Sequence, residues 1–169
     1  MGFLIFEGCD LVGKSSLIEK MNLTKIKGNP NFSFQDWQNY ISIISQNTYF
    51  LLKNFQHLNF ALDRLAISDY VYNKVYSRNV DVSHINLKQD FKNSKIVYVT
   101  VSSVSILEKR YQERGDEKIS FDKVKMLYEE YETFFKTFND LPFIKIINDD
   151  FIQQNNNINL INKFWNFNE

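Results

Sequence analysis

Eight residues near the start of the sequence have the types and the spacing needed to hold a phosphate group. Residues 8–15, Gly-Cys-Asp-Leu-Val-Gly-Lys-Ser, fit the pattern G-x-x-x-x-G-K-[ST]. Glycines let the backbone curve around an anion with its N–H groups pointing inward, and the positive end of a following helix points to the same place. Lys14 is then expected to contact the β- and γ-phosphates of a nucleoside triphosphate, and the Ser15 hydroxyl to join the shell of a Mg²⁺ ion. The residues expected to bind ATP are Gly8, Val12, Gly13, Lys14, Ser15 and Ser16.

The segments on either side of this loop have the patterns that such a loop requires. Residues 3–7 form a short, continuous apolar run, which is typical of a buried parallel strand. After the loop, Leu17, Ile18 and Met21 recur at helical spacing. Strand, loop and helix in this order open a β-α-β unit, so the loop is expected at the carboxyl end of a buried strand.

Strands and helices alternate along the rest of the chain. Further strands are predicted at 58–62, 96–101 and 143–147, and the stretch 28–34 is predicted to be a turn that leads into a short strand. Helices are predicted within 36–55, 68–76, 104–113, 121–138 and 151–165. This alternation indicates an α/β fold of the P-loop NTPase type, with a parallel sheet of about five strands flanked by helices.

Composition limits the class of protein. The chain has 169 residues, enough for one domain with a full apolar core, and we expect a single domain over 1–169. Its 20 basic and 20 acidic residues give a net charge of 20 − 20 = 0, which argues against a nucleic-acid-binding surface. No apolar run approaches the roughly 20 residues of a membrane span. Its one cysteine, Cys9, cannot build a disulfide framework. We expect a cytoplasmic protein that binds small-molecule nucleotides and does not bind a membrane. Whether it forms a homodimer is left open.

Arginine is scarce, so its positions are informative. It occurs at 64, 78, 110 and 114, which leaves 20 − 4 = 16 basic residues that are lysine. The planar guanidinium fork suits phosphate better than an ammonium group does. A catalyst of phosphoryl transfer has to gather positive charge around several phosphates, and rare arginines are natural candidates for that task.

Four segments resemble thymidylate kinases, in the order in which that family has them. Residues 6–16 are similar to the family's phosphate loop, F-E-G-x-D-x-x-G-K-S-[ST], and residues 62–72 to its D-R-[YFH]-x-x-S-x-x-A-Y-Q segment. Residues 97–102 resemble its L-Y-L-D-V-S strand end. Residues 106–115 resemble its arginine-bearing lid, L-x-x-R-x-x-x-R-G. The chain is short for this family, which is typical of a bacteriophage or other viral enzyme, and the cytoplasm would then be that of the host.

The resemblance implies roles for particular residues. It implies that Arg64 grips the phosphate of the acceptor, that Asp63 lies near the Mg²⁺ shell, through a water molecule or directly, and that Asp10 faces the acceptor. It also implies that Arg110 and Arg114, on a lid at about 108–118, approach the phosphoryl group during transfer. The catalytic residues are then expected to be Lys14, Arg64, Arg110 and Arg114, with ATP and Mg²⁺ as cofactors. The expected acceptor contacts are Asp10, Asp63, Arg64, Phe55, Tyr72 and Asn73.

The sequence departs from the family where the base of the acceptor would be read. Leu11 stands where some members have an arginine in the loop, Asn73 replaces a glutamine, and Thr100 replaces an aspartate. The F-x-x-x-R segment that reads the base has no clean counterpart. Phe50 or Phe55 could stack on the base, but no arginine follows at the right spacing.

These observations favour a kinase that converts a deoxynucleoside monophosphate, most simply dTMP, to its diphosphate by in-line transfer from ATP. Three alternatives stay open. A deoxynucleoside kinase would phosphorylate a sugar hydroxyl, and a polynucleotide 5′-kinase would need a basic groove. A nucleotide-binding regulator without catalysis would leave the placement of the arginines unexplained.

Overall fold

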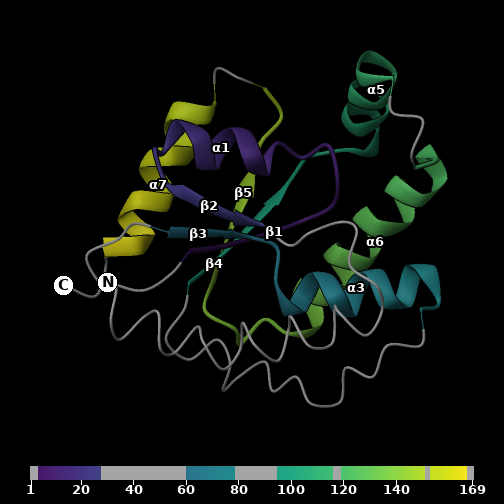
Figure 1. Ribbon diagram of the computed structural model, residues 1–169, viewed down its shortest axis with the longest axis horizontal. Helices are drawn as coiled ribbons and strands as arrows, with labels where there is room; N and C mark the ends of the chain where they lie inside the picture. The colour runs from purple at the N-terminus through teal and green to yellow at the C-terminus, as the bar shows by residue number, and fades with distance from the viewer. Residues whose placement is uncertain (1–3, 28–59, 79–94, 116–118, 151–152, 167–169) are drawn as a thin grey trace.

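A five-stranded parallel sheet forms the centre of the molecule (Figure 1). The structure is a computed structural model, and it describes residues 4–27, 60–78, 95–115, 119–150 and 153–166. The strands lie in the order β2-β3-β1-β4-β5, and all four strand pairs are parallel. Their bounds are β1 Leu4–Glu7, β2 Thr24–Lys27, β3 Phe60–Asp63, β4 Lys95–Thr100 and β5 Phe143–Ile147.

Helices cover both faces of this sheet, as the alternating pattern predicted. Figure 1 shows α1 and α7 on one side of the sheet and α3 and α6 on the other, with α5 beyond the carboxyl ends of the strands. The bounds are α1 Lys14–Lys20, α3 Ala66–Tyr76, α5 Val104–Arg114, α6 Phe121–Thr137 and α7 Gln154–Asn166. None of the described helices is long and apolar enough to cross a membrane.

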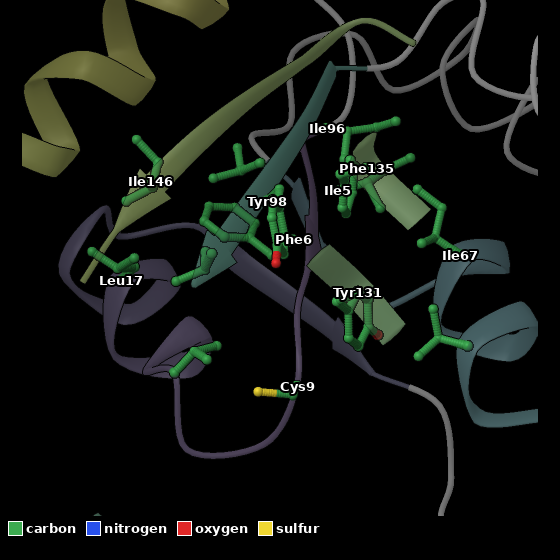
Figure 2. Packing of buried hydrophobic residues seen from close by; sticks show 14 of the residues in the cluster. Ile5, Phe6, Cys9, Leu17, Ile67, Ile96, Tyr98, Tyr131, Phe135 and Ile146 are labelled. Atoms are coloured by element: carbon green, nitrogen blue, oxygen red, sulfur yellow. The ribbon is translucent and has the colours of Figure 1, made fainter. Parts of the chain in front are cut away.

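The central strands are mostly apolar, and helices bury them from both sides. All four residues of β1 are buried, and β4 is buried from its second residue onward. Figure 2 shows Leu17 and Ile146 on one side of β1, and Ile67 and Tyr131 on the other. The ring of Tyr98 on β4 stacks on Phe135 of α6 with their centroids 4.1 Å apart.

Helix α6 owes its place to an apolar stripe. Its buried residues recur every three or four positions, which places them on one face of the helix. They are Val124, Leu127, Tyr131, Phe134 and Phe135. This stripe packs against α3 and the sheet, and the opposite face carries the charged residues. The expected helix at 121–138 is therefore confirmed almost to its ends.

The fifth strand differs from the one that the sequence predicted. The edge strand β2 covers Thr24–Lys27, whereas the predicted short strand falls within 28–34, outside the described residues. Two of the four β2 residues are lysines, so the segment lacks an apolar run, and its pairing with β3 is what makes it a strand. The predicted helix within 36–55 also lies outside the described residues. The asparagine-rich stretch near the C-terminus is helix α7, as expected.

Candidate active site

The phosphate loop joins β1 to α1 and depends on two glycines. Gly8 has a φ of 141°, and a Cβ atom there would lie 2.2 Å from the carbonyl oxygen of Val99. Gly13 has a φ of 85° and directly precedes helix α1 as its N-cap. Both positions exclude a side chain, the first by contact and conformation and the second mainly by conformation. The loop therefore closes tightly over the carboxyl ends of β1 and β4.

Lys14 folds back over the inside of this loop. Its Nζ donates hydrogen bonds to the carbonyl oxygens of Gly8 at 2.8 Å and Cys9 at 2.7 Å. Burial, together with the positive charge of Arg64, lowers the pKa of Lys14 to about 8. An ammonium group in this position is available to exchange two carbonyl oxygens for the oxygens of a phosphate, whose negative charge would raise the pKa of Lys14 again.

Cys9 lies within the loop as a buried spacer. Its side chain points into the core in Figure 2 and is 2% exposed. Burial raises the pKa of its thiol to about 12, so it is not a nucleophile at neutral pH.

Ser15 and Asp63 form the pair expected near a metal ion. The Ser15 hydroxyl donates to Asp63 Oδ2 at 3.1 Å, although the two residues are 48 positions apart. Asp63 ends strand β3, next to β1 in the sheet, and this parallel pairing brings its carboxylate to the loop. A hydroxyl and a carboxylate are the oxygen donors that Mg²⁺ prefers, so the residues fit this ion. The described residues contain no group of three or more His, Cys, Asp or Glu that could hold a metal. The rest of the shell would have to come from phosphates and water.

Asp10, Arg64 and Tyr72 form a second cluster beside the loop. Arg64 Nη2 donates to Asp10 Oδ1 at 2.6 Å, and the Tyr72 hydroxyl donates to Asp10 Oδ2 at 2.7 Å. The guanidinium carbon of Arg64 also lies 5.0 Å from the centre of the Tyr72 ring. Burial alone would raise the pKa of Asp10, but the charges of Arg64 and Lys14 lower it to about 2. Asp10 is therefore a stable anion that fixes the guanidinium.

Arg64 is held at a cost in backbone conformation. Its φ is 75°, a value that residues with a side chain rarely adopt. Its backbone N–H donates to the carbonyl oxygen of Phe6 at 3.0 Å, which ties the end of β3 to β1. Among the described residues, its buried Nε atom has no hydrogen-bond partner. Strain and an unused buried donor at one residue are features of a functional site.

Glu7 holds other residues of the site in place, a role that was not predicted from the sequence. Its carboxylate is fully buried and accepts hydrogen bonds from Leu65 N at 2.8 Å, Ser68 Oγ at 2.5 Å and Tyr131 Oη at 3.3 Å. Burial raises its pKa to about 7 in spite of these donors. Because Leu65 follows Arg64, the Glu7 carboxylate fixes the turn that presents Arg64.

A cleft of about 610 Å³ lies on the other side of the loop, between helix α5 and the start of α7. Both lid arginines line it, together with Leu11, Gly13 and Ser16. Arg110 donates to three backbone oxygens, those of Leu11 at 2.8 Å, Asn148 at 2.7 Å and Asp149 at 2.8 Å. Arg114 is exposed at the end of α5. The cleft has the place and the size for the donor nucleotide.

The structure brings most of the expected site residues together around the loop. Val12 contributes its backbone, since its side chain is buried in the core. Asn73 lies half-buried on α3 beside Tyr72. Phe55 lies outside the described residues. The fourth arginine, Arg78, packs its guanidinium over the rings of Tyr72 and Tyr76, at 5.7 and 5.0 Å from their centres.

Asn148 is a residue that the sequence reading missed. It follows β5 and is fully buried, and its Nδ2 donates to the carbonyl oxygen of Val12 in the loop at 2.8 Å. Asparagine is abundant in this chain, so its type carried no information. Its position directly after a predicted parallel strand could have indicated a role, because ligands of such folds bind at the carboxyl ends of the strands.

Comparison with known proteins shows the same fold in several solved structures. Deoxyadenosine kinase from M. mycoides with the products dCMP and dCDP superposes with a TM-score of 0.64 at 23% identity, covering 98% of this chain and 99% of that one. The same enzyme with dCTP gives a TM-score of 0.61 at 24% identity over 98% and 99%. The chain has the fold of these kinases. The YorR protein from Bacillus subtilis, in complex with phosphorylated GDP, gives 0.60 at 19% identity over 95% and 96%.

No protein-family model matches the sequence, and no curated protein matches it significantly. The expected α/β fold of the P-loop kinase type is confirmed by the sheet and by these structures. The narrower resemblance to thymidylate kinases stays a prediction.

Proposed function

We propose that this protein is a kinase that transfers the γ-phosphate of ATP to a deoxynucleoside monophosphate. The observation that carries the proposal is the half-buried Arg64 beside the phosphate loop, which is fixed by Asp10 and Tyr72 and whose Nε has no hydrogen-bond partner among the described residues. A guanidinium held rigidly in this way suits the phosphate of an acceptor, since it offers parallel N–H groups without further ordering.

The donor half of the reaction is assigned to the loop and the cleft. Lys14 would exchange the carbonyl oxygens of Gly8 and Cys9 for the β- and γ-phosphates of ATP. Ser15 and Asp63 would hold Mg²⁺, which neutralises and orients the phosphates when it is bound. Arg110 and Arg114 would reach the transferred group from α5, with Arg110 exchanging the backbone oxygens of Leu11, Asn148 and Asp149 for phosphate oxygens as the lid at about 108–118 closes to exclude water.

The three carboxylates at the phosphate loop favour a monophosphate over a nucleoside as acceptor. A sugar hydroxyl must lose a proton to a base during transfer, whereas a phosphate oxygen is already ionised. Asp10 has a pKa of about 2 and is a weak base. Glu7 has a more suitable pKa, but its side chain is 0% exposed and its oxygens are occupied by three donors. Asp63 is engaged by Ser15. None of these three described carboxylates is therefore both basic and accessible to an acceptor.

A deoxynucleoside kinase is the second candidate. The full-length likeness to deoxyadenosine kinase from M. mycoides favours it, because that structure holds dCMP as a product.

The thymine base of the proposed acceptor, dTMP, rests on the resemblance to thymidylate kinases. Phe55, the expected base contact, lies outside the described residues.

An acceptor panel tests the proposal. Purified protein with ATP and Mg²⁺ is offered each deoxynucleoside, each deoxynucleoside monophosphate and a 5′-hydroxyl oligonucleotide, and ADP formation is measured. We expect turnover with monophosphates, and fastest with dTMP. Turnover with deoxynucleosides alone would replace the proposal by the second candidate. Turnover with the oligonucleotide alone would indicate a polynucleotide kinase, and binding of ATP without any turnover would indicate a regulator.

A further inference from the structure

The outer side of the phosphate loop is held by side chains from distant parts of the chain. Two consecutive backbone oxygens of the loop accept hydrogen bonds from outside it. Leu11 O accepts from Arg110 Nη1 at 2.8 Å, and Val12 O accepts from Asn148 Nδ2 at 2.8 Å. These donors lie 99 and 136 residues away in the sequence.

Holding a carbonyl oxygen also fixes the N–H group of the same peptide. The peptide bonds of the described residues are trans, so each C=O points opposite to the N–H that follows it. With the Val12 oxygen turned outward to Asn148, the Gly13 N–H is turned toward the interior of the loop. Loop N–H groups that point inward are the ones that bind phosphate oxygens.

Asn148 is itself fixed on every side. Its backbone N–H donates to Thr100 O at 2.8 Å, and its backbone oxygen accepts from Arg110 Nη2 at 2.7 Å. Asn157 on α7 donates through Nδ2 to Ile147 O at 3.0 Å and to Asn148 Oδ1 at 3.4 Å. Because Asn148 Oδ1 accepts from Asn157, the Nδ2 group on the other side of the same amide faces the loop. The two hydrogen bonds therefore agree on one orientation of the Asn148 amide. A Cβ atom on Gly13 would lie 2.5 Å from that Nδ2 atom.

We propose that Asn148 is a positioning residue for the triphosphate, which directs the Gly13 N–H at the phosphates by holding the Val12 carbonyl, and that Asn157 supports it. This rests on the proposed function only in assuming that the loop binds a nucleoside triphosphate. It explains why buried asparagines occupy two positions where apolar residues would otherwise be expected. It also gives Gly13 a second reason to lack a side chain.

Calorimetric titration of ATP, ADP and AMP, each with Mg²⁺, tests this in the whole protein. In Asn148→Ala the affinity for ATP and ADP should fall by about ten-fold, the size expected for a charge-assisted hydrogen bond, while AMP should change by less than about two-fold. Asn148→Asp should bind ATP and ADP more weakly still, because it places a carboxylate against the carbonyl oxygen of Val12. Asn157→Ala should show a smaller loss of the same kind. The exposed Asn155 on the same helix supplies the control, and Asn155→Ala should bind all three like the wild type.

Comparing nucleotides within one variant separates positioning from general damage, since a folding defect lowers the active fraction equally for all three. The inference is wrong if Asn148→Ala binds ATP as tightly as the wild type, or if AMP loses as much affinity as ATP. Failure of the wild-type protein to bind ATP at all would instead refute the proposed function.

Discussion

Single residues at this site are held in conformations that only their contacts explain. Arg64 has a left-handed backbone conformation, is salt-bridged to Asp10 and contacts the face of Tyr72. Glu7 keeps a carboxylate in the core to fix the turn behind it. Both residues are expected to lower the free energy of unfolding while they keep the site in its geometry, and this loss of stability can be measured.

Two substitutions of Arg64 separate its charge from its backbone strain. Arg64→Ala and Arg64→Gly both delete the guanidinium, so both should raise the KM for the acceptor by roughly 10- to 100-fold and leave the affinity for ATP nearly unchanged. Arg64→Gly should be the more stable of the two by about 1 kcal/mol, because glycine adopts a φ of this sign without strain. Steady-state kinetics and denaturant unfolding measure the two effects. Loss of ATP binding in either variant would contradict the assigned role.

Glu7 should make the stability of the protein depend on pH. Its pKa is raised from 4.5 to about 7 by burial, so the folded state binds more protons than the unfolded state between these values. Its contribution is therefore fully present below about pH 4.5 and is lost as the pH rises through 7, by up to about 3 kcal/mol. Asp69, whose pKa burial also raises to about 7, adds a dependence of the same sign.

Comparison with Glu7→Gln isolates this contribution. Urea unfolding from pH 5 to 8 should show a shallower decline in the free energy of unfolding for Glu7→Gln than for the wild type. Equal slopes in the two proteins would show that Glu7 does not titrate in this range.

At the scale of elements, helix α6 supports the half of the sheet that carries the cluster of Asp10, Arg64 and Tyr72. It supplies Tyr131, which reaches Glu7 and Ser68, and an aromatic group around Phe134. Phe134 is 2% exposed, and its ring lies 4.6 Å from Phe138 and 5.4 Å from Tyr70, between centroids. Helix α6 thus connects the apolar core to the site, because its buried Tyr131 contacts both Glu7 and Ser68.

Phe134→Ala should leave a cavity and cost about 3–5 kcal/mol, which corresponds to a fall in Tm of roughly 10 °C. Met126→Ala on the same helix is the matched control, because Met126 is 44% exposed and its truncation should change stability by less than about 0.5 kcal/mol. Thermal unfolding followed by circular dichroism gives both values. Similar Tm values for the two variants would mean that the apolar stripe does not carry the stability of α6.

At the scale of the whole molecule, the site exists because parallel strands end at one edge of the sheet. The parts that meet there come from positions far apart in the sequence: the loop after β1, Asp63 at the end of β3, Arg64 directly after it, and Asn148 after β5. The cleft adds α5 and the start of α7. Binding of a nucleotide should therefore stabilise the molecule as a unit.

ATP with Mg²⁺ at about 100 times its Kd should stabilise the folded state by about 2.7 kcal/mol, or raise Tm by roughly 5–10 °C. Addition of EDTA should reduce this shift, since Ser15 and Asp63 would then lack the ion that links them to the phosphates. Lys14→Ala should lose most of the shift as well. A shift of the same size in Lys14→Ala would argue that ATP binds elsewhere.

The sequence alone determined the phosphate loop, the α/β alternation and the candidate arginines, because these depend on local signals. An apolar run, a glycine at a fixed spacing and a helical stripe each act within a few residues. The same reasoning missed β2, whose lysine-rich segment is a strand only through its pairing with β3. Only the tertiary structure decided that Glu7 is buried and fixes the turn after Arg64, that Arg110 holds backbone oxygens, and that Asn148 holds the loop. Those contacts join residues that sequence distance separates, and burial, which no local pattern encodes for a polar residue, gives them their effect.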